Sequence, residues 1–259
     1  MPPAWLVPVL IAGVMASMVA AERIWPASQA RPEWGANALA YVLTLAGQLV
    51  RGTLPAVATA AAIAHFGGGL IDLAQWPFWA GATAWLITMD LGEYLFHRAQ
   101  HSIPFLWAMH SLHHSDRGLN FLTAQRHFWL EPAIKSVTVW LVPALLLRPT
   151  PAILALYVVI SLYHFVVHAN LRLGFGPLSW ALNAPRYHRL HHSRDPAHYN
   201  TNFASLLPIF DVLSGAYRAP RAGEYPATGL EEAVQRHWEL IVWPVRRWIP
   251  FRRASVKAT

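Results

Sequence analysis

Long apolar stretches with few charges are the feature that most constrains how this 259-residue chain can fold. Charged residues make up 13% of it, against roughly 25% in soluble domains. The stretches cover residues 4–21, 35–71, 73–96, 132–147 and 150–168. Since a helix needs about 20 mainly apolar residues to cross a bilayer, the pattern predicts an all-α, polytopic membrane helix bundle. A disordered chain does not fit this composition.

Three of these stretches leave alternatives open. Residues 4–21 also fit a secretory signal peptide, although no Lys or Arg precedes the apolar run. Residues 35–71 contain chain breakers, so one spanning helix with an interfacial partner and a broken helix pair both fit. The stretches 132–147 and 150–168 are joined by the sequence RPTP, which predicts a helical hairpin that crosses the bilayer or dips into it.

Basic residues predict the orientation of the bundle. Of the 20 Lys and Arg residues, 12 follow residue 171 and four more lie between residues 97 and 135. Positive residues favour the cytoplasmic side, so the loop 97–131 and the C-terminal region are expected to face the cytoplasm of a multi-pass protein, in a bacterial inner membrane. The net charge of +7 fits such loops, and no nucleic-acid partner is expected. The sequence LIVWPVRRWIPFRR is expected to lie along the membrane surface.

Histidine is unusually abundant, with 14 residues, whereas cysteine is absent. The lack of cysteine excludes cysteine-ligated zinc, iron–sulfur clusters and thiolate-bound haem in this chain. Ten histidines form four clusters with helical spacing. These clusters are His97 and His101; His110, His113 and His114; His164 and His168; and His188, His191 and His192.

The clusters predict metal binding, because burying ten imidazoles together is costly unless they are paired or bound to metal. A single pair four residues apart would be weak evidence, since such pairs are common by chance. Four clusters projecting to the same side of the membrane are far more specific. Neutral imidazole binds iron, zinc and copper well. Eight to ten nitrogens exceed the positions around one ion, so two metal ions are expected.

The stretches DLGEYLFHRAQH and PRYHRLHHSRD, with the motifs HxxxH and HxxHH, resemble the fatty acid hydroxylase/sterol desaturase family of integral-membrane di-iron oxygenases. The resemblance covers roughly residues 70–218 and includes NFASLLPIFDVLSGAY. It implies a small membrane bundle with a cytoplasmic helical cap that carries the histidine clusters and two non-haem iron ions. It also implies O2-dependent hydroxylation or desaturation of a fatty acyl, sterol-like or isoprenoid lipid.

Carried over residue by residue, the resemblance assigns nine catalytic metal ligands. These are His97, His101, His110, His113, His114, His168, His188, His191 and His192. His164 matches an additional metal ligand found in part of the family. The implied organisation is an N-terminal transmembrane region (1–71), a hydroxylase-like catalytic domain (72–218) and a cytoplasmic or interfacial tail (219–259). No cytochrome b5-like domain is recognisable, so electrons are expected from a separate protein of ferredoxin or cytochrome b5 type with its reductase.

Acidic residues near the clusters are expected to support the ligands by accepting a hydrogen bond from the ring nitrogen that does not bind metal. The candidates are Asp90, Glu93, Asp116, Asp195 and Asp211, and a salt bridge or helix cap is the alternative for each. His127, in QRHFWLEP, is expected to be structural or to support a ligand.

A histidine-rich membrane metal-ion transporter is the alternative function. Transporters place their ligands near the bilayer midplane, often on broken helices, whereas the clusters here fall at helix ends and in a loop. A haem b electron carrier would leave most of the imidazoles unused. The sequence leaves hydroxylation and desaturation both open.

Overall fold

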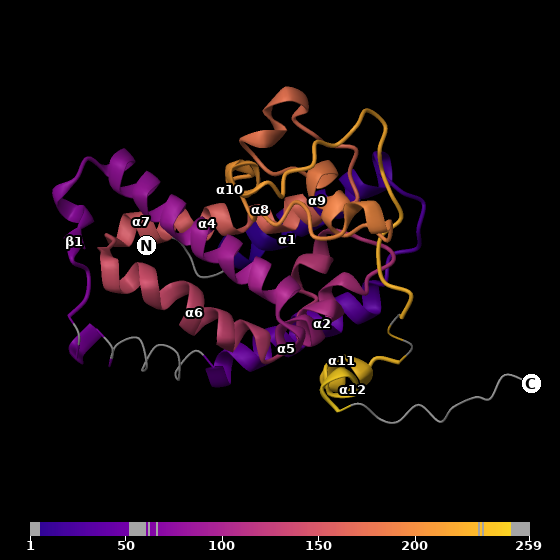
Figure 1. Ribbon diagram of the computed structural model, residues 1–259, viewed down its shortest axis with the longest axis horizontal. Coiled ribbons are helices and arrows are strands. Elements are labelled where there is room, and N and C mark those ends of the chain that lie inside the picture. Colours follow the sequence, from indigo (N-terminus) through magenta and orange to yellow (C-terminus); the bar gives the residue numbers. More distant parts are fainter. Residues whose placement is uncertain are drawn as a thin grey trace, which may run out of the picture.

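The structure is a computed structural model that describes residues 6–51, 61, 63–65, 67–232, 234 and 236–249. The chain is mostly helical (Figure 1), which confirms the predicted helical class. Within the described residues, strands are limited to β1 (Ile71–Asp72) and β2 (Leu147–Arg148), which pair in parallel.

The helices differ widely in length. The longer ones are α1 (Leu6–Ile24), α2 (Trp34–Arg51), α4 (Phe78–Ser102), α5 (Pro104–His114), α6 (Glu131–Leu146) and α7 (Pro151–Ser161). The short ones are α8 (Tyr163–His168), α9 (Pro185–His191), α10 (Ile209–Ser214), α11 (Glu239–Val242) and α12 (Val245–Trp248). Short 3-10 helices are η1 (Leu73–Gln75), η2 (Phe121–Gln125), η3 (Gly176–Trp180) and η4 (Pro196–His198).

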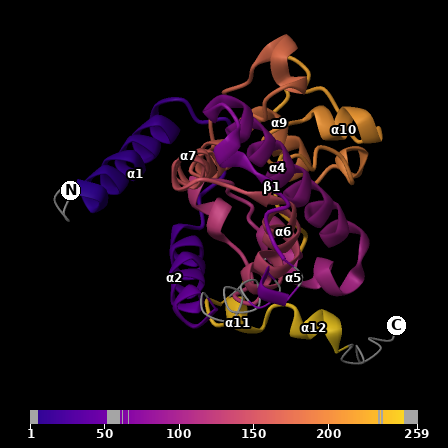
Figure 2. The same ribbon diagram turned by 90° about the vertical axis from the view of Figure 1, so that its left-hand side faces the viewer.

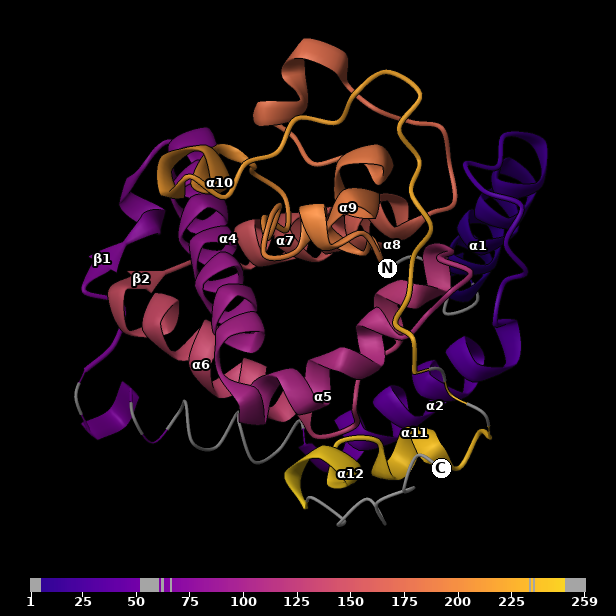
Figure 3. The ribbon, with the colours of Figure 1, turned by 45° about the vertical axis from the view of Figure 1, so that its right-hand side comes forward.

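Prolines determine both ends of α4. Pro77 precedes its first turn, and Pro104 follows soon after its last residue, Ser102. A proline disfavours the helical conformation of the residue before it, and Ile103 is accordingly extended, with φ −101° and ψ 116°. The chain therefore leaves α4 here and continues into α5 in a new direction (Figure 3).

The predicted hairpin packs against α4. An apolar cluster joins α4 to α6 and α7, with Trp85, Val139 and Ile153 fully buried in it. The rings of Trp140 and Tyr157 lie 6.4 and 6.5 Å from Trp85, and 5.4 Å from each other. Aromatic pairs at these separations add to the stabilisation that burial provides. The two arms of the hairpin are therefore both held on α4.

Within the described part of the chain, one helical stretch is long and apolar enough to cross a bilayer. It is Pro151–His168, formed by α7 and α8, with a mean hydropathy of 1.8. Its side chains are largely unburied, and Val158 and Val159 are 62% and 63% exposed. The 16 residues of α6 extend about 24 Å, less than the roughly 30 Å of hydrocarbon. A multi-pass bundle remains a prediction, as does the choice for residues 35–71, because residues 52–60 lie outside the described residues.

The first two helices contact the segment that follows the second histidine cluster. Glu22, at the end of α1, accepts hydrogen bonds from the backbone N–H groups of Phe121 and Asn170. The buried guanidinium of Arg126 donates to Glu33 and to Asn37 on α2. α1 then extends away from the rest of the chain (Figure 2). The N-terminal helices thus hold the loop 115–130 in place.

Asp211 is expected to make a large contribution to stability. Its buried carboxylate accepts hydrogen bonds from the N–H groups of Phe203 and Ala204 and from the hydroxyl of Tyr187. Asp211→Ala leaves three buried donors without an acceptor, each worth about 1–3 kcal/mol. The free energy of unfolding should therefore fall by about 3 kcal/mol or more. Thermal unfolding in detergent measures this, and Asp195→Ala, which removes a cap of η4, is the control with a smaller loss.

Candidate metal centre

The histidine clusters lie at the ends of four helices that converge. His97 and His101 lie in the last turns of α4, and the second cluster forms the last two turns of α5. His168 ends α8, and the fourth cluster lies on α9 and its C-cap. Because α5 leaves α4 after a sharp turn at Ile103 and α8 packs beside α9, segments far apart in sequence meet here (Figure 3).

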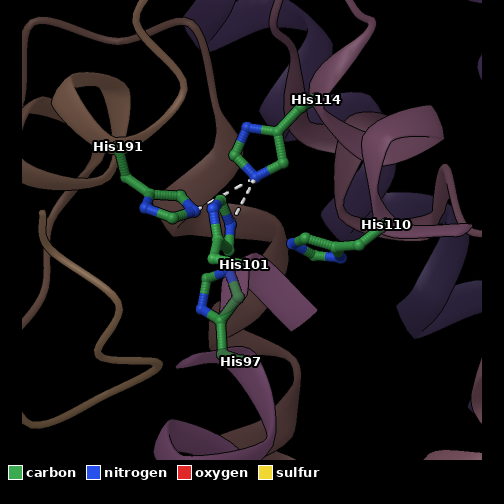
Figure 4. A group of neighbouring side chains, drawn as sticks. All are labelled: His97, His101, His110, His114 and His191. Carbon is green, nitrogen blue, oxygen red and sulfur yellow. Dashed lines mark hydrogen bonds between the residues drawn. The ribbon is translucent and has the colours of Figure 1, made fainter. Parts of the chain in front are cut away.

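Nine of the ten predicted ligands form two groups in which the ligand nitrogens lie within 4.8 Å of one another. Group A contains His97, His101, His110, His114 and His191. Group B contains His113, His168, His188 and His192. Figure 4 shows the five rings of group A converging from α4, α5 and α9. A third set of residues that could hold a metal ion, His110, His127 and Glu131, shares His110 with group A, and the number of bound ions stays a prediction.

The HxxHH spacing explains why each of these clusters contributes to both groups. At about 100° per residue, the first and last histidines lie roughly 40° apart around the helix, and the middle one lies on the other side of the first. On α5 the outer pair, His110 and His114, belongs to group A and His113 to group B. On α9 the assignment is reversed, since His191 joins group A.

Backbone carbonyls fix the tautomers of three rings. Nδ1 of His97 lies 2.7 Å from the carbonyl oxygen of Phe203, Nδ1 of His191 lies 2.9 Å from that of Thr201, and Nδ1 of His168 lies 2.7 Å from that of His164. A carbonyl oxygen can only accept, so each Nδ1 carries the proton. In the neutral ring Nε2 then keeps its lone pair, which is the state that binds a metal ion.

The nitrogens of each group crowd together in a way that suits a bound cation. In group B, Nε2 of His168 lies 3.1 Å from that of His113 and 2.9 Å from that of His188, which is 3.1 Å from that of His192. In group A, Nε2 of His97 and of His110 are buried, and neither has a hydrogen-bond partner among the residues that the structure describes. Lone pairs that face one another and buried nitrogens without partners are both satisfied by a metal ion. The residues therefore fit two metal ions that prefer imidazole.

Burial also holds the rings in the neutral form that metal binding requires. Desolvation lowers the pKa of His113 and His114 well below the usual value, and neighbouring imidazoles lower it further. The same two causes, in the same order, lower the pKa of His188 and His192. The imidazoles are therefore ready to bind a cation at neutral pH.

These lowered pKa values predict that the metal-free protein is sensitive to acid. In the unfolded chain these histidines titrate near pH 6.5 and take up protons that the folded form excludes, so the unfolded state gains stability as the pH falls. Above about pH 7 both states are neutral and the effect vanishes. The free energy of unfolding should drop steeply from pH 6.5 to pH 5 in chelator-treated protein, and constant stability over that range would contradict the prediction.

His164 lies outside both groups. Its Nε2 atom contacts the hydroxyl of Ser205, although the ring follows the HxxxH spacing with His168. The structure thus brings together nine of the ten residues predicted as ligands and separates the one that was assigned as an additional ligand.

Glu131 is a residue of the site that the sequence reasoning missed. It is 2% exposed, and its Oε1 atom lies 3.3 Å from Nδ1 of His110 and 2.9 Å from Nδ1 of His127. Gln100 donates to the same oxygen at 2.6 Å. Burial alone would raise the pKa of Glu131, but the imidazoles of His127 and His110 hold it well below the usual range. The signal available in the sequence was the i, i+4 spacing from His127.

His127 contacts a predicted ligand, which agrees with one of the two expectations for it, that it supports a ligand. Its ring stacks on that of His113, with centroids 4.8 Å apart and planes inclined by 5°. Glu131 and His127 together therefore contact one ligand of each group, His110 in group A and His113 in group B.

The five acids that were expected to accept hydrogen bonds from the ligand histidines have other partners in the structure. Within the described part of the chain, none of their carboxylates bonds to a ring of group A or group B. Asp90 accepts from the N–H groups of Leu206 and Leu207, and Glu93 pairs with Lys135 at 2.6 Å. Asp116 and Asp211 hold loops, and Asp195 caps η4. The alternative of a salt bridge or cap thus describes Glu93 and Asp195, whereas Asp90, Asp116 and Asp211 bind loop segments.

The comparisons with known proteins agree with this site. The sequence model of the fatty acid hydroxylase family matches residues 82–216, just over half of the chain. The chain is 34% identical to an alkylglycerol monooxygenase of Xenopus tropicalis over 143 residues, which cover 54% of this chain and 31% of the relative. It is 33% identical to an ornithine lipid hydroxylase of Rhizobium tropici over 147 residues, which cover 56% of this chain and 44% of the relative. The matched region thus spans less than half of each of these relatives, and no solved structure matches. The chain belongs to the fatty acid hydroxylase family.

Proposed function

We propose that this protein is a membrane-bound non-haem di-iron oxygenase that hydroxylates a lipid. The observation that carries the proposal is the convergence of nine imidazoles, seven of them in buried residues, into two groups in a member of the fatty acid hydroxylase family. A pair of bound iron ions would supply the redox chemistry by which O2, two electrons and two protons convert a C–H bond into C–OH and water.

The residues of the chain have distinct parts in this proposal. Groups A and B would each hold one iron ion, and the carbonyls of Phe203 and Thr201 keep the lone pairs of His97 and His191 available. Most of these rings are buried, so bulk water is kept away from the reacting atoms. Charge-assisted bonds to Glu131 support His110 from outside group A.

Several observations support a lipid substrate taken from a bilayer. Exposed apolar side chains cover α4 and α7, among them Leu91, Leu95, Val158 and Val159. Exposed apolar surface of this extent is typical of contact with a membrane. The names of the relatives, alkylglycerol monooxygenase and ornithine lipid hydroxylase, both refer to lipid oxidation and favour hydroxylation over desaturation. The basic residues favour a multi-pass protein whose site faces the cytoplasm.

Electrons are proposed to come from a separate protein of ferredoxin or cytochrome b5 type with its reductase. The chain contains no cysteine and so no iron–sulfur cluster of its own. The reaction needs two electrons from outside the lipid and O2, because one oxygen atom leaves as water.

The test uses purified protein in lipid nanodiscs. About two iron ions per chain and incorporation of 18O from 18O2 into a lipid, dependent on a reductant, are expected. The double variant His113→Ala/His191→Ala should lose the incorporation of 18O and the ion of group B, which keeps three imidazoles, and should bind iron more weakly in group A. Zinc-selective binding with zinc flux into proteoliposomes, and no oxidation of lipid, would instead establish the transporter alternative.

A further inference from the structure

One short segment supplies two of the carbonyl groups that bond to ligands of group A. The carbonyl oxygen of Thr201 lies 2.9 Å from Nδ1 of His191. The carbonyl oxygen of Phe203 lies 2.7 Å from Nδ1 of His97. These two rings come from different helices, α9 and α4 (Figure 4). The residue between the two carbonyls is Asn202, so its conformation decides whether both can reach group A at once.

Asn202 has an unusual backbone conformation. Its φ is 60°, and Asn200, two residues before it, has a φ of 57°. Within the described part of the chain, these are the non-glycine residues with positive φ. Residues with a Cβ rarely adopt this left-handed conformation, although Asn tolerates it better than most. Such a conformation persists where the surrounding structure holds it in place. The contacts of Asn202 are therefore expected to hold this bend.

The side chain of Asn202 is fully buried and joins three segments of the chain. Its Oδ1 atom accepts a hydrogen bond from the N–H of Arg218 at 2.7 Å, and its Nδ2 atom donates to the carbonyl of the same residue at 3.0 Å. Nδ2 also donates to the carbonyl of Tyr187, at 3.3 Å. A backbone N–H can only donate and a carbonyl can only accept, so these partners fix the orientation of the amide.

The bond to Tyr187 connects the segment to the helix that carries His191. Tyr187 precedes His191 by four residues on α9, so the two lie about one helical turn apart on one face. Asn202 is thus attached to α9 close to the ring that the carbonyl of Thr201 contacts. The bonds to Arg218 hold the same side chain from the opposite strand of the loop. The position of both carbonyls therefore depends on this one amide group.

Asn200 shares the backbone conformation of Asn202 but not its surroundings. Its side chain is exposed, whereas Asn202 is 0% exposed. Glycine adopts positive φ without the steric cost that a Cβ brings. A glycine at either position can therefore keep the bend, but at position 202 it removes three buried hydrogen bonds. The two positions separate the effect of the backbone conformation from the effect of the amide group.

We propose that Asn202 is a positioning residue that holds the carbonyls of Thr201 and Phe203 against two ligands of group A. Partners of this kind orient a ligand ring and keep its other nitrogen directed at the metal ion. In group B, the ring of His168 bonds instead to the carbonyl of His164 within its own helix. Asn202 therefore acts on group A alone. The inference rests on the proposed function, since it concerns one of the two metal ions of that centre.

Binding of 57Fe2+ is measured with the purified protein in nanodiscs, by competition with a chelator and by Mössbauer spectroscopy. The wild type should show two doublets, one for each group. Asn202→Gly should weaken the affinity for one of the two ions by about 10–100-fold and change one doublet. His101→Ala, in group A, should change the same doublet, whereas His188→Ala, in group B, should remove the other. Asn200→Gly is the matched control and should bind iron like the wild type.

Unchanged affinities and doublets in Asn202→Gly would overturn the proposal, as would equal weakening of both sites, which indicates a general loss of structure. Circular dichroism of the metal-free variants shows whether they fold. If the Gly variant does not fold, Asn202→Asp replaces it, because it has nearly the same shape and loses only the donated bonds, and it should weaken the same site.

The affinity for Zn2+, measured by the same competition, gives a second comparison that needs no iron. A wild type that binds zinc but no iron would contradict the proposed function. Weaker binding of one zinc ion in Asn202→Gly would then still support the role of Asn202, and equal zinc binding by both proteins would overturn it.

Discussion

Replacing His188 by Ala is expected to remove one of the two proposed metal ions. Nε2 of His188 contacts those of both His168 and His192, so this ring lies at the centre of group B. Group B has four imidazoles, and the variant leaves three. Metal content measured by mass spectrometry at limiting free iron should fall from about two ions per chain to about one, as expected when a ligand of a four-coordinate site is lost. The proposed hydroxylation, which would need both ions, should fall below detection.

Group A provides the informative comparison, because it contains five imidazoles. His101→Ala leaves four, which is still a complete set for a four-coordinate ion. This variant should keep close to two ions at saturating iron and lose affinity at one site only. His237→Ala, in the exposed part of the tail, should bind like the wild type. If the His188 variant kept two ions as tightly as the wild type, the assignment of group B would be wrong.

Replacing Glu131 by Ala is expected to weaken metal binding in group A without removing any ligand. The carboxylate holds Nδ1 of His110, so that Nε2 is directed into the group. Loss of a partner of this kind typically lowers metal affinity or activity by about 10–100-fold. Binding of iron by group A should weaken by that factor, as measured by competition with a chelator, and the electronic spectrum of the bound iron should change.

Glu131→Gln separates this positioning role from simple loss of stability. Its amide oxygen can still accept from His110, so it should restore most of the affinity that the Ala variant loses. Glu131→Ala should also be less stable, by about 3–5 kcal/mol, because it leaves a buried network without one partner. Glu232→Ala is the control, since Glu232 is half exposed and pairs with Arg247 at the surface, where such a pair contributes about 0–1 kcal/mol. Iron affinity unchanged in Glu131→Ala would show that Glu131 has no effect on the metal site.

The sequence was sufficient to predict a metal site built from imidazoles, because the spacing of the histidines along each helix is a local property. The i, i+4 and i, i+3 spacings determine which face of a helix each imidazole occupies. His97 and His101 are therefore expected on the same face of one helix. The same spacing already implies that His110 and His113 point in different directions. Prolines at 77 and 104 likewise determine the ends of α4 from local sterics.

The grouping of the histidines and their hydrogen-bond partners depend on contacts between segments that lie far apart in the sequence. The packing of α9 beside α8 and of α5 against α4 determines which helix faces meet. As a result, the outer histidines of the HxxHH motif belong to group A on α5 and to group B on α9. His164 shows the limit clearly. Its spacing from His168 is the same as that of His97 from His101, yet Ser205 from a distant loop binds its ring instead. The carbonyl partners of His97 and His191 come from loops that no spacing rule describes.

The apolar stretches and the histidine spacing therefore determined, by themselves, that this chain is helical, rich in apolar surface and equipped with imidazoles in sufficient number for two metal ions. The tertiary structure alone decided how nine of these imidazoles divide into two groups, that His164 is separate from them, and that Glu131 supports His110. The physical reason is that helical periodicity fixes directions within one segment. The distances between segments depend on packing, on proline turns and on hydrogen bonds from loops such as 203–207.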